Sequence, residues 1–171
     1  MPDETSQPEP VNAKNRDYFA ELYVAGILGD AGWSIYFPKR DVGFDFIAVK
    51  ELRGQVVIRP VQVKGKYPAQ SKGDKPVYGY IGQLSQLHAE MVLAIPYFPT
   101  DQRGVAPTCT AYMPRWAIRP QAGRGWACQP ARFLSGIPKA RRDFQRYFDY
   151  AGIDLMESEN WSTKPDKLAI P

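Results

Sequence analysis

Cysteine and histidine are scarce in this chain, which has two cysteines and one histidine. Cys109 and Cys128 lack the close spacing of zinc ligands, and adding His88 does not complete a standard zinc site. A serine or cysteine nucleophile with a histidine base would have to use His88, which falls in an apolar series with helical spacing. We therefore expect buried or loop thiols and a histidine on a helix face, with little support for a zinc centre or a nucleophilic hydrolase.

Long apolar runs are also lacking. No stretch approaches the ~20 consecutive apolar residues of a membrane-spanning helix. The first ten residues are acidic and contain proline, unlike a secretory signal. We expect a cytoplasmic protein with no membrane partner. With 171 residues and 44% hydrophobic composition, the chain is long enough for one domain with a buried core.

The net charge of +4 is distributed unevenly. Residues 1–10 contain three acids, and residues 154–171 contain four acids and two lysines. The segment between these two ends is therefore more basic than the whole chain. Basic side chains that neutralise phosphates gain free energy from counterion release. This favours DNA as a partner, although many basic domains bind no polyanion.

Two apolar segments that predict a β-hairpin are the most informative pattern. Asp45 opens the first segment, a polar turn occupies residues 50–55, and the second segment runs from Val56 to Lys64. Side chains alternate between the faces of a strand, so Gln62 and Lys64 point to the same side. Hairpin pairing brings Asp45 beside them. We therefore expect one oxygen-rich site flanked by a lysine.

This combination suits phosphodiester hydrolysis. A carboxylate and an amide oxygen are hard ligands of the kind that Mg²⁺ takes, so Asp45 and Gln62 are candidate ligands of Mg²⁺ or Mn²⁺. Lys64 lies on the same side, where it can orient water and offset charge on phosphoryl oxygens. Taken singly, Asp45 is explained as a turn cap and Lys64 as an edge-strand lysine that blocks aggregation. Their combination favours a site.

At these residues the chain resembles the PD-(D/E)XK nuclease superfamily, whose motif places an Asp on one strand and a (D/E)-X-K triplet on the next. The triplet here is Gln62-Val63-Lys64, with glutamine in place of the acid. The nearest resemblance is to archaeal Holliday-junction resolvase-like members, which carry a helical Glu and then a Gly-x-x-Asp strand. Here one residue instead of two separates Gly43 from Asp45. The likeness covers roughly residues 13–67 and rests on a short, degenerate motif.

The resemblance implies an α/β fold with a restriction endonuclease-like core, in which helices flank a mixed central sheet. It implies a metal-dependent DNA endonuclease or junction resolvase in which Glu21, Asp45 and Gln62 hold the metal and Lys64 assists catalysis. A homodimer is also implied, because relatives cut two strands. Gln62 adds no negative charge, so the alternative is a catalytically weak or inactive module of the same fold that binds nucleic acid or a protein. A third possibility is an unrelated α/β domain in which Asp45 and Lys64 lie far apart.

Glu21 lies in a predicted helix over residues 13–29 that is apolar over most of its circumference. Such a helix is expected to be buried, and an ionised carboxylate within it is costly unless it is paired or helps to hold a metal. Lys64 or a shared metal is a natural partner. The alternative is that Glu21 forms a narrow polar strip with Asp17 and meets solvent.

Four basic residues are candidate nucleic-acid contacts. Lys66 follows Lys64 at the same strand parity, and Lys72 lies in a basic loop over residues 66–79. Arg141 and Arg142 lie on the outward face of a predicted amphipathic helix. An ordinary solvated position explains Lys66 equally well and the two arginines at least as well, and a mobile solvated loop is the default explanation for Lys72.

The expected organisation has three parts. Residues 1–12 form a disordered arm, residues 13–153 a nuclease-like domain and residues 154–171 an acidic tail. The other expected elements are helices over residues 81–91 and 139–148 and strands over residues 33–37, 92–98 and 109–113.

Overall fold

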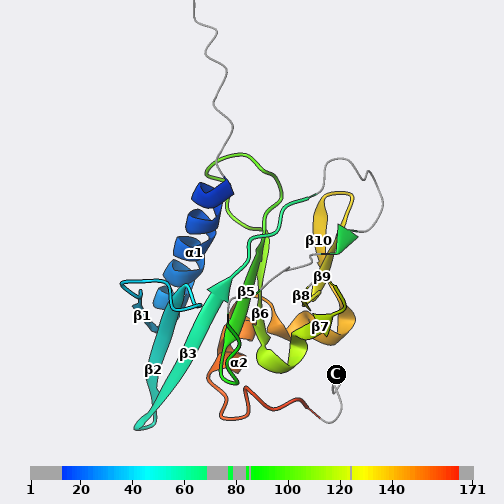
Figure 1. Ribbon diagram of the computed structural model, residues 1–171. Coiled ribbons are helices and arrows are strands. Elements are labelled where there is room, and N and C mark those ends of the chain that lie inside the picture. Colours follow the sequence, from blue (N-terminus) through cyan, green and yellow to red (C-terminus); the bar gives the residue numbers. More distant parts are fainter. Residues whose placement is uncertain (1–12, 69–76, 79–83, 85, 124, 166–171) are drawn as a thin grey trace, which may run out of the picture.

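The fold is α/β, with a mixed five-stranded sheet at its centre (Figure 1). The computed structural model describes residues 13–68, 77–78, 84, 86–123 and 125–165. The predicted arm at residues 1–12 lies outside the described residues. Helix α1 (Ala13–Asp30) comes first, ending one residue beyond its predicted end.

Strand order in the central sheet is β1-β2-β3-β5-β6. Only the β3–β5 pair is parallel, and the other three neighbouring pairs are antiparallel. The strands lie where the apolar segments predicted them, within one residue at either end except that β2 continues three residues into the predicted turn. Their bounds are β1 (Ser34–Tyr36), β2 (Phe46–Leu52), β3 (Gln55–Val63), β5 (Val92–Tyr97) and β6 (Cys109–Pro114).

The β2–β3 hairpin is tighter than its sequence predicts. Its turn is the two residues Arg53 and Gly54, with φ of 51° and 78°, a left-handed pair that suits the twist of a two-residue hairpin. The register runs without a break from Leu52↔Gln55 to Phe46↔Val61. Asp45 therefore lies beside Gln62, as predicted.

Helix α1 packs through one face only. Ala20, Val24 and Leu28 are fully buried, whereas Tyr18 and Leu22 are exposed. The expectation that this helix is buried nearly all round is therefore wrong. The physical reason is that α1 covers one face of a single sheet, so its outer side chains have no second layer to contact.

The two α-helices lie side by side on one face of the sheet, where the hydroxyl of Tyr150 donates to a carboxylate oxygen of Asp30, the last residue of α1, at 3.2 Å. Arg59 of β3 donates from Nε to the carbonyl of Met156, the last residue of α2 (Asp149–Met156), at 2.9 Å. Gln62 faces the same cavity as Glu21 of α1. All six residues of the central strand β5 are buried.

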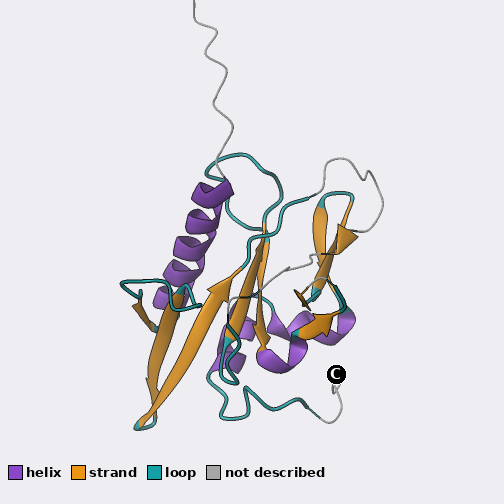
Figure 2. Ribbon diagram, viewed as in Figure 1, coloured by secondary structure: helices purple, strands orange, loops and turns teal. Residues whose placement is uncertain are grey.

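Short strands and 3₁₀-helices form the rest of the described chain. Figure 2 shows them grouped beyond β6, away from α1. They make a three-stranded sheet of order β10-β9-β4 and a separate β7–β8 pair. Their bounds are β4 (Val77–Tyr78), η2 (Arg115–Ala117), β7 (Arg119–Gln121), β8 (Gly125–Ala127), β9 (Ala131–Leu134), β10 (Ile137–Ala140) and η3 (Arg142–Tyr147).

Two predicted helices are corrected. The segment 139–148 ends strand β10 and then forms the 3₁₀-helix η3, because Lys139 and Ala140 pair with β9 instead of beginning an α-helix. Of the predicted helix over 81–91, the described residues 84 and 86–91 contain no helix. A turn leads into β5 instead, in which His88 accepts a backbone hydrogen bond from Met91 at 3.1 Å.

The expected tail from residue 154 begins inside a folded element. Helix α2 continues to Met156, and Trp161 is buried with its indole N–H donating to the carbonyl of Met91 at 3.0 Å. Glu157 forms an ion pair with Lys50 of β2. The fold therefore extends at least to Trp161. Among the described residues, no helix has the length and apolar character needed to cross a membrane.

Candidate functional site

Glu21, Asp45, Gln62 and Lys64 line one cavity of about 620 Å³. Glu21 lies on helix α1, Asp45 immediately precedes β2, Gln62 lies near the end of β3, and Lys64 immediately follows β3. The wall is completed by Tyr18 and by residues of the loop that joins β1 to β2. Chain segments distant in sequence thus bring the four predicted residues together.

Asp45 is held firmly against β3. Its backbone N–H donates to the carbonyl of Val61 at 3.0 Å, and its carboxylate Oδ2 accepts the N–H of Val63 at 2.6 Å. Burial raises the pKa of Asp45, while the hydrogen bond from Val63 and the charge of Lys64 lower it less strongly. The hairpin therefore fixes the direction of this carboxylate toward the Gln62 and Lys64 side of the sheet.

Glu21 is electrostatically coupled to the same group of residues. Burial, followed by repulsion from Asp45 and Asp17, raises its pKa to about 7, and Lys64 opposes the shift. A carboxylate with a pKa near neutrality beside a second carboxylate is a common feature of functional sites. Glu21 is half-buried, so its position lies between the two alternatives drawn from the sequence, a buried site residue and a polar strip with Asp17 that meets solvent. Asp17 also acts on it electrostatically.

Gln62 and Lys64 share one face at the end of β3. Gln62 is 5% exposed, so its amide belongs to the cavity wall and not to the outer surface. Lys64 continues the pairing of β3 with β5, its backbone N–H donating to the carbonyl of Ala94 at 2.9 Å. Backbone hydrogen bonds thus fix the position of the triplet on the central strand pair.

Lys66 lies just outside this cavity. Its backbone N–H donates to Pro96 at 2.9 Å, extending the parallel pairing beyond the end of β3. Burial and then the charge of Lys64 lower the pKa of Lys66 to about 8, and Asp17 opposes the shift. Lys66 therefore belongs to the electrostatic surroundings of Lys64.

The other predicted nucleic-acid contacts do not line the cavity. Arg141 and Arg142 are exposed where β10 meets η3, and Arg141 donates from Nη1 to the carbonyl of Gln129 at 3.4 Å. Lys72 lies outside the described residues. Any role of these two arginines belongs to a surface distinct from the cavity.

The donor set fits a hard divalent cation. In the part of the chain that the structure describes, no three His, Cys, Asp or Glu residues form a metal-binding group. The cavity instead offers the carboxylates of Glu21 and Asp45 and the amide of Gln62, and Asp41 also lines it. Mg²⁺ commonly takes one or two carboxylates and keeps several waters, so this set is sufficient for it.

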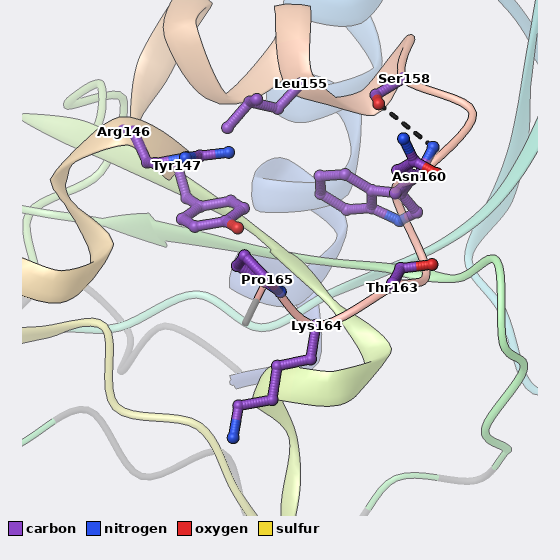
Figure 3. Close-up of a pocket in the computed structure, with 9 residues that line it drawn as sticks. Arg146, Tyr147, Leu155, Ser158, Asn160, Thr163, Lys164 and Pro165 are labelled. Atoms are coloured by element: carbon purple, nitrogen blue, oxygen red, sulfur yellow. Dashed lines mark hydrogen bonds between the residues drawn. The ribbon is translucent and has the colours of Figure 1, made fainter. Parts of the chain in front are cut away.

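A second cavity of about 410 Å³ lies beside the end of α2. In Figure 3, Tyr147 and Leu155 line it from the helical segments, and Thr163 and Lys164 line it from the chain that follows. None of its described lining residues is acidic. It therefore offers no carboxylate to a cation, and none of these lining residues belongs to the sequence motif.

Sequence reasoning missed four residues of the first cavity: Tyr18, Phe37, Lys39 and Arg40. The only available signal was their closeness in sequence to Glu21 and Asp45, since the Phe37-Pro38-Lys39-Arg40 run immediately precedes the motif. An aromatic and two basic residues in a loop have no periodicity that predicts where they point. Their place in the cavity wall is decided by the loop between β1 and β2.

The two cysteines and the histidine do not line this cavity. Cys109 and Cys128 are free thiols, and burial is the main cause that raises the pKa of each to about 12. Protonated thiols are poor nucleophiles. His88 lies in the turn before β5, where its Nδ1 accepts the N–H of Glu90 at 3.1 Å, and not on the predicted helix face.

Comparison with family models and with curated protein sequences identifies no relative. No family model matches the chain, and no curated protein matches its sequence. Function is therefore inferred from the cavity and the residues that line it.

Proposed function

We propose that this protein is a metal-dependent nuclease that hydrolyses phosphodiester bonds in DNA on a restriction endonuclease-like core. The observation that carries the proposal is the single cavity lined by Glu21, Asp45, Gln62 and Lys64. The order α1, antiparallel β1–β2–β3, then parallel β5, also agrees with the PD-(D/E)XK resemblance. Cleavage of two strands would be served by a homodimer.

Glu21, Asp45 and Gln62 are the residues that would hold Mg²⁺ or Mn²⁺. Such an ion acts as a Lewis acid on the scissile phosphate and lowers the pKa of water. Asp45 is positioned for this by its hydrogen bond from Val63. Burial and then repulsion from Asp45 raise the pKa of Glu21, and a cation between the two carboxylates would relieve that repulsion.

Lys64 would act on the substrate. Its side chain lies in the same wall as the carboxylates, where an ammonium donates hydrogen bonds to a phosphate oxygen or to the attacking water. A fixed positive charge aimed at developing negative charge stabilises the transition state more than the ground state. Lys64 is therefore assigned to phosphate positioning and charge stabilisation.

The experiment is cleavage of labelled branched, duplex and single-stranded DNA with Mg²⁺ or Mn²⁺. Asp45→Ala and Lys64→Ala should each reduce cleavage at least about a hundredfold, because each removes a group that acts in the transition state. Asp143→Asn is the matched control, since Asp143 is exposed on η3 and does not line the cavity. Cutting that survives both cavity substitutions would show a contaminating nuclease and refute the proposal.

A second candidate is a nucleic-acid or protein-binding module with weak or absent catalysis. It is favoured by the low negative charge of the cavity, since Gln62 is neutral and the pKa of Glu21 is about 7. Weak metal affinity would follow. DNA that is retained in a salt-sensitive way but not cut by the parent protein would select this candidate.

A further inference from the structure

We propose that the cavity receives an unpaired nucleic-acid strand, stacking its bases on Tyr18 and Phe37 and placing its phosphates against Lys39 and Arg40. The inference rests on the proposed function, because it names the substrate class of the same site. The inference is supported by two exposed rings and two cations that line the same cavity as Asp45 and Lys64.

The aromatic half of the wall is open to solvent. Tyr18 and Phe37 are 59% and 50% exposed, although they come from separate elements, α1 and the loop after β1. Phe37 also contacts the buried ring of Phe46, with centroids 5.6 Å apart. One part of the Phe37 ring is thus anchored in the fold while the rest remains available. Exposed rings grouped around one cavity are a mark of a binding site.

The basic half of the wall complements a polyanion. Lys39 and Arg40 are exposed and line the cavity beside Asp41. The Asp41 carboxylate accepts the N–H of Gly43 at 2.8 Å, a local hydrogen bond within the loop. Among the described residues, neither Lys39 nor Arg40 takes part in the ion pairs Lys50–Glu157 and Arg59–Glu90. Both cations are therefore available to phosphates.

Rings and cations together select an unpaired strand over a duplex. In a duplex both faces of a base are covered by its neighbours, and a side-chain ring has no face to stack on. Unpaired bases offer that face regardless of sequence, while lysine and arginine side chains follow the phosphates. The charge also favours nucleic acid over an apolar protein segment. A flap, a splayed end or a single strand presents the required chemistry.

Binding without metal tests the ring contacts. Fluorescence anisotropy with a labelled oligothymidine and a hairpin duplex of equal length, in chelator, should show tighter binding of the single strand. Tyr18→Leu and Phe37→Leu should each weaken single-strand binding about tenfold. Phe37→Trp keeps a ring and should retain binding. Tyr150→Leu is the matched control, because Tyr150 is also exposed but lies on α2 and does not line the cavity.

Salt dependence tests the cations. Each phosphate contact on a single strand contributes about 0.7 to the slope of log affinity against log salt concentration. A Lys39→Ala/Arg40→Ala double variant should therefore lower that slope by about 1.4. Arg119→Ala should leave it unchanged, since Arg119 is exposed on β7 and does not line the cavity.

The outcomes separate this inference from the nuclease proposal. Equal affinity for strand and duplex, ring substitutions without effect, or no binding of either oligonucleotide would each overturn the inference. Ring-dependent binding of single strands with no metal-dependent cleavage would support it and refute the nuclease. Cleavage that is lost on substitution of Asp45 or Lys64 but unchanged on substitution of Tyr18 or Phe37 would support the nuclease and overturn this inference.

Discussion

The carboxylate of Asp45 accepts a 2.6 Å hydrogen bond from the backbone N–H of Val63. Val63 is the middle residue of the Gln62-Val63-Lys64 triplet, and its side chain points to the opposite face, into the core. One backbone group thus ties the aspartate to the strand that carries the other two polar side chains. The geometry of the cavity depends on this link between the two strands of the hairpin.

Gln62→Glu should strengthen metal binding and cleavage. A third carboxylate adds a charged oxygen ligand, so the Mg²⁺ concentration for half-maximal cleavage should fall about tenfold. In chelator the same change should lower the free energy of unfolding by about 2 kcal/mol, because it buries another negative charge beside Glu21 and Asp45. Titration of activity with Mg²⁺ and urea unfolding measure the two effects.

Gln62→Met is the control for this prediction. It keeps the volume of the side chain but removes the oxygen ligand, so cleavage should fall while stability in chelator holds within about 1 kcal/mol. If Gln62→Glu and Gln62→Met behave alike in the metal titration, Gln62 does not contact the metal.

Glu21 should titrate near neutral pH in the metal-free protein. Its pKa is raised from 4.5 to about 7, so the folded state holds its proton more tightly than the unfolded state does. The stability that this group contributes is complete below pH 4.5 and is lost as the pH rises through about 7. Wild type should therefore lose about 1 kcal/mol relative to Glu21→Gln between these limits, after allowance for solvent screening.

Urea unfolding of both proteins in chelator at several pH values checks the sign and size of this effect. Asp45→Asn removes a repulsive charge and should bring the pKa of Glu21 down toward its usual value, as followed by carboxyl ¹³C NMR. A pKa of Glu21 that does not respond to Asp45→Asn would show that the two carboxylates are not coupled.

Arg59→Ala should destabilise the fold by about 3 kcal/mol. Arg59 is a buried cation that joins β3 to the end of α2, donating to the carbonyls of Met156 and Ser158 at 2.9 Å and pairing with Glu90. Its loss leaves buried carbonyls without their donor. Arg59→Lys should rescue little, because an ammonium cannot reproduce the planar fork. Arg119→Ala, at an exposed position, should cost less than about 0.5 kcal/mol in the same urea titration.

Two helical glycines should respond oppositely to alanine. A Cβ at Gly152 in α2 would lie 2.3 Å from the carbonyl oxygen of Tyr147, so Gly152→Ala should destabilise by at least about 2 kcal/mol. A Cβ at Gly26 in α1 meets nothing within 4 Å, so Gly26→Ala should stabilise by about 0.5 to 1 kcal/mol. Thermal unfolding of both variants provides the comparison. A tolerated Gly152→Ala would show that α2 does not approach Tyr147 so closely.

Local sequence was sufficient for α1, the five central strands and the grouping of Asp45 with Gln62 and Lys64. Strand alternation fixes which side chains share a face, and a tight hairpin fixes which residues lie opposite each other. Sequence was not sufficient for η3 and the turn before β5, where helical spacing of apolar residues predicted α-helices. Of those apolar side chains, Met91, Tyr147 and Phe148 are buried by contacts with other elements, and such contacts override local periodicity.

What the sequence determined by itself is therefore the central sheet and the chemistry of its polar triplet, because both follow from local alternation. Only the tertiary structure decided that Glu21 meets Asp45, that Tyr18, Phe37, Lys39 and Arg40 complete the same wall, and that Trp161 belongs to the core. These relationships join segments far apart in the chain. They depend on how α1, the β1–β2 loop and the C-terminal segment pack on the sheet, which no local pattern specifies.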